Sequence, residues 1–140
     1  MTYAKSILNA AIVSLLSFAT PHLTSTAFAE SLPTDKGCKK VENPDAMMKG
    51  WCVAINRTKG NCLACHTMTV NPWPEGLPPG GNIAPPLVAM KQRFPDKEKL
   101  RAQIWDATEA NPNSAMPPFG KHKLISDEDV DNIVEFLLTI

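Results

Sequence analysis

The sequence predicts a small all-α fold. In three segments, apolar residues recur at the three- and four-residue spacing of a helix, and no segment shows the two-residue alternation that is typical of a strand. These segments cover residues 45–57, 96–110 and 126–140. Polar and proline-rich stretches separate them, so we expect one domain with one modest core.

The first 29 residues have the pattern of an export signal. Lys5 supplies a positive charge, residues 7–18 form an apolar run, and residues 27–29 read Ala-Phe-Ala, a small-x-small cleavage site. The alternative is an uncleaved membrane anchor, but the apolar run is short for a membrane span. We therefore expect cleavage after Ala29 and a periplasmic mature protein without a membrane span.

The mature chain is expected to begin with a polar arm at residues 30–42, followed by a domain at residues 43–140. Asn43 resembles a helix cap, and Pro44 suits the first turn of a helix. A helix over residues 45–57 should follow and lead to the segment described next. Its apolar stripe consists of Met47, Met48, Trp51, Ala54 and Ile55.

Residues 62–66 read Cys-Leu-Ala-Cys-His, which is the signature of covalent haem attachment. Two thiols at this spacing add to the two haem vinyl groups, and the adjacent imidazole then lies beneath the iron. We predict that Cys62 and Cys65 bind one haem c and that His66 is an axial ligand of its iron. A zinc site would need further ligands at similar spacing, and a thioredoxin-like dithiol would need a βαβ context; the sequence has neither.

Two further cysteines, Cys38 and Cys52, remain after haem attachment. An even remainder in an oxidising compartment indicates a disulfide between them. A bridge closing a loop of this size would stabilise the protein by roughly 3 kcal/mol. The alternatives are two buried thiols, or a bond from Cys38 to a partner subunit.

Residues 71–86 contain six prolines and three glycines, which prevents a regular element. We expect a rigid loop laid over the haem. At its end, a backbone carbonyl within residues 83–87 is placed to accept a hydrogen bond from His66 Nδ1, and we assign this role to Pro85. Such a contact would orient the imidazole and strengthen it as a ligand. The alternative is a simple turn before the next helix.

Beyond this loop, residues 88–93 predict one or two helical turns, and Asp96 has the position of a cap for the helix at 96–110. Asn111 and the proline after it should end that helix. Trp105 is expected in the core against the haem edge, since large aromatic side chains are usually buried, rather than as an electron relay.

A haem iron bound by one imidazole needs a sixth ligand or an open position. Met116 is our choice for the sixth ligand, because it is followed by two prolines on a segment that is not helical. Thioether coordination would raise the reduction potential and close the iron to small molecules. The alternatives are His122 and Met90, whereas Met47 and Met48 lie on a helix stripe and are read as core.

The last helix is capped by Ser126 and has acidic residues in its first turn, where the helix dipole favours them. Ile125 is placed to pack against its first buried turn. The helix should cross the first one near Trp51. Its buried face is predicted to consist of Val130, Ile133, Val134 and Leu137.

The chain has 14 basic and 14 acidic residues, and no basic patch is interleaved with aromatic residues, which argues against nucleic-acid binding. Basic residues are concentrated at 36–59 and acidic residues at 127–135. Solvated helix faces explain this unevenness better than electrostatic steering. Lys121 and Lys123 are candidates for a docking rim beside Met116, although solvated loop charges are the simpler explanation.

The helix before the haem motif, the Pro-Leu loop, the methionine segment and the terminal helix together resemble class I c-type cytochromes. A more specific similarity, which covers residues 59–140, is to the SoxX family, the mono-haem subunits of the SoxAX thiosulfate-oxidising cytochrome complex. The resemblance implies a small class I cytochrome c domain around one covalently bound haem. It is carried by residues 59–66, 81–87, 93–96, 100–104 and 111–120.

The resemblance also implies partners. A SoxA-like dihaem or monohaem cytochrome would form a heterodimer with this chain and hold the active-site haem of an L-cysteine S-thiosulfotransferase. There, thiosulfate would be joined oxidatively to the carrier cysteine of SoxYZ. This chain would accept the electrons and pass them to a cytochrome or oxidase. It has no catalytic constellation of its own, so catalysis would belong to the complex.

Two other functions are considered. The first is a free-standing periplasmic cytochrome c that shuttles electrons between redox enzymes. The second is a small haem peroxidase, which needs an open iron position; ligation by Met116 argues against it.

Overall fold

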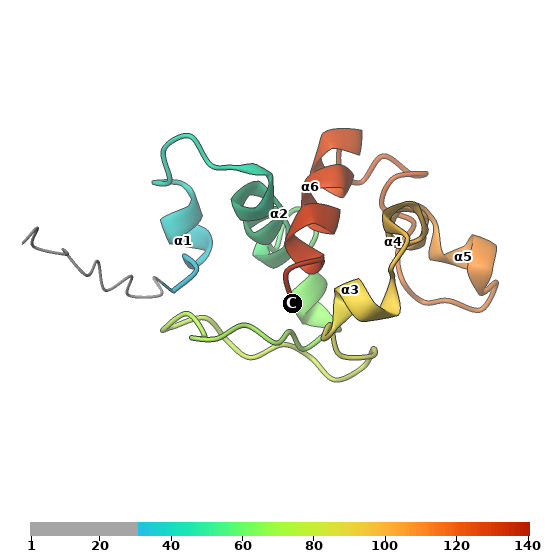
Figure 1. Cartoon of the computed structure of the whole chain (residues 1–140), viewed down its shortest axis with the longest axis horizontal. Coiled ribbons are helices and arrows are strands. Elements are labelled where there is room, and N and C mark those ends of the chain that lie inside the picture. The colour runs from blue at the N-terminus through green and yellow to red at the C-terminus, as the bar shows by residue number, and fades with distance from the viewer. Residues whose placement is uncertain (1–30) are drawn as a thin grey trace, which may run out of the picture.

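The computed structural model describes residues 31–140, so the expected export signal and its cleavage after Ala29 lie outside the described residues. The described part contains helices and loops but no strand, apart from an isolated parallel bridge between Met68 and Leu87. None of its helices is long and apolar enough to cross a membrane. In chain order (Figure 1), the elements are α1 (Asp35–Cys38), α2 (Ala46–Ile55), η1 (Cys62–Ala64), α3 (Met90–Arg93), α4 (Lys97–Trp105), α5 (Ala107–Ala110) and α6 (Asp127–Leu137).

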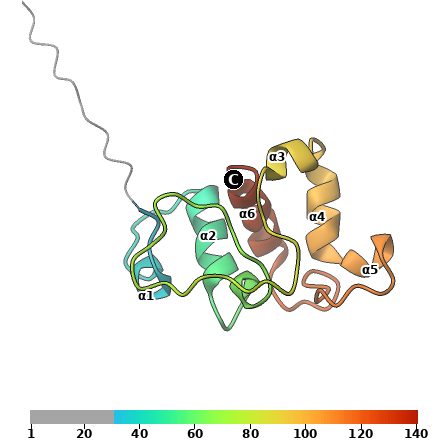
Figure 2. The same cartoon turned by 90° about the horizontal axis from the view of Figure 1, so that it is seen from below.

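Helices α2 and α6 pack against each other at the centre of the domain, with α1 at one end and α4 and α5 at the other (Figure 1). A long loop between η1 and α3 runs along one edge of the domain, from beside α1 to α3 (Figure 2). This loop contains residues 71–86, for which the proline content predicted no regular element; that prediction is confirmed.

The two central helices approach each other closely at Gly50. A side-chain carbon at this position would lie 1.9 Å from the backbone oxygen of Asn132, so the contact requires glycine. Beside it, the ring of Trp51 packs edge-on against Phe136, with centroids 5.3 Å apart, and both side chains are fully buried. The predicted crossing of these helices near Trp51 is therefore confirmed.

The apolar stripes predicted for the long helices form the core. All four residues of the predicted stripe on α6 are buried, and Ile125 is buried beside them. Phe136 was not part of that stripe but is fully buried as well. The largest fully buried side chains include Trp51, Phe136, Leu100, Ile133, Val130 and Val134.

Helix α2 is shorter than predicted at both ends. Asp45, rather than Asn43, is its cap: the Asp45 carboxylate accepts a hydrogen bond from the Met48 amide at 2.8 Å. Asn43 instead adopts a left-handed conformation, with φ 48°. The helix ends at Ile55, because Asn56 is extended and its side chain accepts a hydrogen bond from the amide two residues later.

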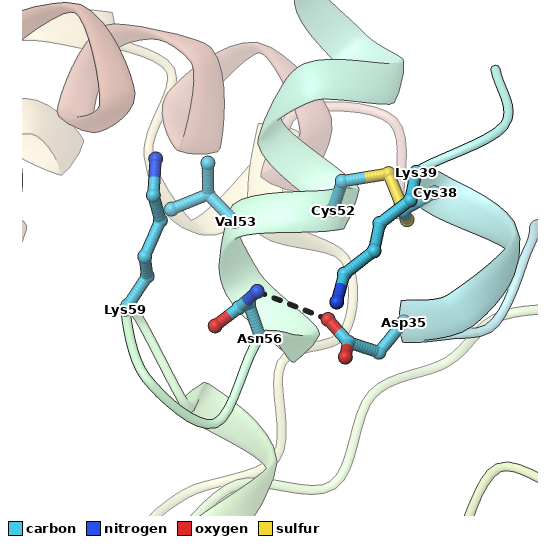
Figure 3. A pocket seen from close by; sticks show the side chains of 7 residues that line it. All are labelled: Asp35, Cys38, Lys39, Cys52, Val53, Asn56 and Lys59. Carbon is cyan, nitrogen blue, oxygen red and sulfur yellow. Dashed lines mark hydrogen bonds between the residues drawn. A yellow bond between two sulfur atoms is a disulfide. The ribbon is translucent and has the colours of Figure 1, made fainter.

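The segment expected to form a polar arm is fastened to α2. It contains α1, on which no residue is buried, as expected. A disulfide joins Cys38 to Cys52, with Cα atoms 5.7 Å apart, which confirms the predicted pairing against its two alternatives. The Asn56 amide donates to the Asp35 carboxylate at 3.0 Å, across a surface hollow beside the disulfide (Figure 3).

The helix predicted over residues 96–110 is interrupted at Asp106. Asp96 caps α4 as predicted, but Asp106 is extended and caps a separate short helix, α5. The Asp106 carboxylate accepts hydrogen bonds from the amide and hydroxyl of Thr108 and forms an ion pair with Lys121. It is only 2% exposed. A side chain that binds nearby backbone and side-chain donors so strongly competes with the continuation of the helix.

Trp105 is half-buried rather than part of the core. The guanidinium of Arg101 and the amine of Lys123 lie over its ring, 5.0 and 4.9 Å from the centroid. A side-chain carbon at Gly120 would lie 2.0 Å from the ring, so Gly120 packs directly against the indole. Trp105 therefore lies outside the buried core cluster of the protein, between Gly120 and two cationic side chains.

The uneven charge of the sequence is balanced in the fold. Every acidic side chain of α6 pairs with a basic side chain, four of them from distant segments. The pairs are Asp127 with Lys123, Glu128 with Lys49, Asp129 with Lys59, Asp131 with Arg101 and Glu135 with Lys97. Such partly exposed pairs contribute about 1 kcal/mol or less each. The two lysines considered as a docking rim, Lys121 and Lys123, are both ion-paired.

The contact at Gly50 generates a test of the central packing. Alanine is normally favoured over glycine in a helix by about 1 kcal/mol. At Gly50, however, the added carbon would collide with the backbone of α6, and we expect the free energy of unfolding to fall by about 1–3 kcal/mol. Chemical denaturation measures the change. Lys49→Ala, on the exposed side of α2, is the control and should cost at most about 1 kcal/mol. A stabilised Gly50→Ala protein would contradict the packing described here.

The buried carboxylate at Asp106 predicts a specific loss of stability in acid. Its pKa is lowered from 3.8 to about 2, first by the hydrogen bond from Lys121 and then by Thr108, against the opposing effect of burial. Because the folded-state pKa is lower than the ordinary one, the charged carboxylate stabilises the fold above pH 3.8, and this contribution is lost as the pH falls to about 2.

Urea denaturation at a series of pH values tests this expectation. The difference in unfolding free energy between wild type and Asp106→Asn should be largest above pH 3.8 and shrink as the pH approaches about 2. Glu128→Gln, which removes an exposed ion pair, is the control. A wild-type to Asp106→Asn difference that stays constant over this range would mean that Asp106 is not the titrating group.

Candidate haem site

One tight turn brings the three residues of the haem signature together. The amides of Cys65 and His66 both donate to the backbone carbonyl of Cys62, at 3.2 and 2.9 Å, around η1. Before the turn, Asn61 is left-handed with φ 46°, and Gly60 packs so closely on the backbone of α2 that a side chain would clash. The end of α2 therefore fixes where the turn begins.

Both thiols of this turn are unpaired and half-buried. Burial raises the pKa of the Cys62 thiol to about 12, so the thiol is protonated at neutral pH. A redox-active Cys-x-x-Cys pair works through a thiolate with a lowered pKa. The environment of Cys62 is therefore unlike that of a thioredoxin-type site and leaves a neutral thiol for covalent attachment.

The imidazole of His66 is held by the loop that follows it. Its Nδ1 atom lies 2.6 Å from the backbone oxygen of Pro85. Because a carbonyl can only accept a hydrogen bond, Nδ1 carries the hydrogen, and in the neutral ring the lone pair is then on Nε2. This is the ring orientation that a histidine ligand of a metal requires.

The loop is joined to the turn along its length. A side chain at Gly80 would lie 2.0 Å from the carbonyl oxygen of His66, and one at Gly81 would lie 2.4 Å from that of Ala64. The loop can therefore approach this closely only with glycine at both positions. Backbone hydrogen bonds run from Gly81 to Leu63 at 2.8 Å, from Ala84 to Cys65 at 3.0 Å and from Leu87 to Thr67 at 2.8 Å.

Two residues that the sequence analysis did not single out also hold this loop. The indole of Trp73 donates to the Leu77 carbonyl at 2.8 Å, and its ring packs edge-on against Trp51 at 6.2 Å. The guanidinium of Arg93 donates to the Pro86 carbonyl at 2.8 Å, one residue beyond the carbonyl that binds the imidazole. A lone tryptophan within a proline-rich stretch was the available sequence signal for the first of these contacts.

Met116 lies on the irregular segment between α5 and α6 and is half-buried. Its side chain packs against the hydrophobic core, as does that of Cys62. The Met116 amide donates to the hydroxyl oxygen of Ser114 at 3.2 Å. Its thioether thus comes from a non-helical loop, which is the setting that the sequence analysis favoured for an iron ligand.

The other ligand candidates have different surroundings. Met90 is only 2% exposed, and its sulfur accepts a hydrogen bond from Arg93 at 3.4 Å. His122 is exposed. Met47 and Met48 are half-buried on α2 and pack against the core, as expected for a helix stripe.

The donor set fits a haem c. It combines two unpaired thiols at the attachment spacing, an imidazole whose Nε2 is free, and a half-buried thioether. Within residues 31–140, no group of three or more histidine, cysteine, aspartate and glutamate side chains is arranged to hold a metal ion. Hydrogen bonds bring Cys62, Cys65, His66 and Pro85 together, and Met116 packs against the same hydrophobic core as Cys62.

A protein-family model matches residues 54–137 of this chain. The family is described as cytochrome c oxidase, cbb3-type, subunit III. The matched segment contains the haem-attachment turn, the proline-rich loop, the methionine loop and α6. It begins after Cys52, so the disulfide lies outside the match.

Among solved structures, the chain is similar to the crystal structure of SoxXA from P. pantotrophus. The two share 22% sequence identity and superpose with a TM-score of 0.59; the match covers 76% of this chain and 96% of that chain. At this level of identity, the likeness is evidence for the fold. No curated protein matches the sequence.

Proposed function

We propose that this chain, which belongs to the family described as cytochrome c oxidase, cbb3-type, subunit III, is the electron-accepting haem c subunit of a SoxAX-type complex. Membership implies haem c binding and electron transfer. The all-α cytochrome c fold expected from the sequence is confirmed by the family match and by the likeness to SoxXA.

The observation that carries the SoxX assignment is the extent of the fold likeness, which covers 96% of the matched SoxXA chain. The sequence similarity to SoxX at residues 81–87 and 111–120 supports it independently. Residues 81–87 hold the imidazole, and residues 111–120 carry Met116.

Each site residue has a defined role in this proposal. Cys62 and Cys65 would hold the haem through thioether bonds, and His66 and Met116 would bind its iron. When bound, the haem supplies an iron that takes up and releases one electron at a time. The Pro85 carbonyl keeps the hydrogen on Nδ1 of His66, so that Nε2 is the metal-binding atom. The thioether of Met116 would raise the reduction potential and keep small molecules from the iron.

The partners follow from the SoxX assignment. A SoxA-like dihaem or monohaem cytochrome would bind this chain as a heterodimer, and thiosulfate would be joined there to the carrier cysteine of SoxYZ. Forming that sulfur–sulfur bond releases two electrons, which this chain passes singly to a cytochrome or oxidase. The complex, rather than this chain alone, would be the thiosulfotransferase. It would work in the periplasm after export by the signal at residues 1–29.

Met116→Ala tests the axial ligand. Without the thioether, we expect the methionine-to-iron charge-transfer band of the ferric protein to disappear and the reduction potential to fall. Absorption spectroscopy and potentiometric titration measure the two effects. Met90→Leu is the matched control, because Met90 is a buried methionine whose sulfur is bound by Arg93; it should keep the band. Retention of both the band and the potential in Met116→Ala would exclude this residue as the ligand.

The partner is tested by using the mature holoprotein, residues 30–140, to capture binding proteins from periplasmic extract of the source organism. Mass spectrometry should identify a larger c-type cytochrome among the bound proteins. Thiosulfate should then reduce the haem of this chain only when that cytochrome and a SoxYZ-type carrier are both present. Omission of the carrier is the control.

Two results would contradict the subunit proposal. One is a cytochrome that never co-purifies with a SoxA-like protein and is reduced equally well by unrelated donors, which would indicate a free-standing shuttle. The other is rapid turnover of peroxide by the isolated chain, which would indicate an open iron position and a peroxidase.

A further inference from the structure

The loop that carries Met116, residues 111–121, is held by hydrogen bonds at its two ends, which we call its base, rather than at its tip around Met116. The amides of Gly120 and Lys121 both donate to the backbone carbonyl of Trp105, at 3.2 Å each. On the other side of the base, the Asn111 amide donates to the backbone carbonyl of Ala107 in α5 at 3.0 Å. At the tip, the Met116 amide bonds only to the nearby Ser114 hydroxyl among the described contacts. The position of the thioether therefore depends on how firmly the base is held.

Asp106 is the ionised side chain at this base. One of its carboxylate oxygens accepts hydrogen bonds from the amide and hydroxyl of Thr108, and the other pairs with the Lys121 amine. Its side chain is 0% exposed, whereas that of Lys121 is 52% exposed. Asp106 thus joins the start of α5 to the residue at which the chain leaves the methionine loop.

A helix cap alone does not explain this arrangement. An uncharged asparagine or serine would cap α5 equally well. A buried carboxylate is costly unless it is paired, and here the pairing partner comes from the far end of the loop. Gly120 and Trp105, the neighbours in sequence of Lys121 and Asp106, also pack on each other, so two adjacent contacts hold the base of the loop.

We propose that Asp106 is a positioning residue for Met116: by holding Lys121 across the base of the loop, it keeps the thioether where it binds the haem iron. This inference rests on the proposed axial ligation by Met116. Asp106, which lies between α4 and α5, would then influence the iron although it is far in sequence from the haem-attachment turn.

The test uses the ferric holoprotein and an added ligand, imidazole, which binds the iron only after the thioether has left. Asp106→Asn keeps the cap of α5 and removes the charge that holds Lys121. Lys121→Met keeps the aliphatic stem and removes the amine. For each variant we expect the apparent affinity for imidazole to rise about tenfold, which corresponds to about 1.4 kcal/mol. The charge-transfer band should weaken or melt at lower temperature.

Two comparisons separate positioning from general stability. Glu135→Gln removes the ion pair between α6 and Lys97 at the start of α4, at the opposite end of that helix from Trp105; it should leave the imidazole affinity unchanged whatever it costs in stability. In the double variant of Asp106→Asn and Lys121→Met, the effects should not add, because both act through one ion pair.

The outcomes are distinguishable from those of the proposed function. If the wild-type protein shows the band, but Asp106→Asn and Lys121→Met bind imidazole as it does, the positioning role is wrong and axial ligation by Met116 stands. A wild-type protein without the band overturns both. An equal rise in Glu135→Gln also overturns the positioning role, because it would reflect only a less stable domain.

Discussion

The approach of two backbones at Gly50 and Asn132 is the constraint from which the rest of the domain follows. With no side chain between them, α2 and α6 form one central pair, and Trp51 and Phe136 fill the space beside the contact. The end of α2 then sets the start of the haem-attachment turn. The proline-rich loop is built onto that turn and, through Trp73, onto Trp51. The position of the His66 imidazole is thus linked through a few contacts to the crossing of two helices.

The electrostatics of the domain follow from the same crossing. When α2 packs on α6, Glu128 and Asp129 meet lysines from the basic start of the chain, and the other acidic side chains of α6 pair with basic residues of later segments. Basic and acidic residues that are separated along the sequence are therefore paired on the surface of the folded domain. The ion pair at Asp106 differs from these pairs because its carboxylate is buried, and only there does the pairing decide the path of the chain.

Much of this structure was predictable because its signals are local. The haem signature, the stripe and cap of α6, the disulfide and the irregular loop depend on residue types at fixed spacing, and the fold retains each of them. Errors at the ends of α2 came from local caps, whereas those at the end of α4 came from contacts made at a distance. Asp106 interrupts a helical pattern because Lys121 reaches it from beyond the next loop, and Lys123 reaches the ring of Trp105 from the same segment. Gly50 carried no signal by itself, since its role depends on the backbone of Asn132.

The separation of the four cysteines has a consequence for how the protein is made. Cys38 and Cys52 are oxidised to one another, whereas Cys62 and Cys65 are unpaired, as attachment of a haem through their thiols would require. Pairing α1 with α2 places the first two thiols side by side, and the neutral, sheltered thiol of Cys62 is a poor partner for exchange. Once α1 lies on α2, the fold favours the bridge between Cys38 and Cys52 and leaves the two thiols of the attachment turn unpaired.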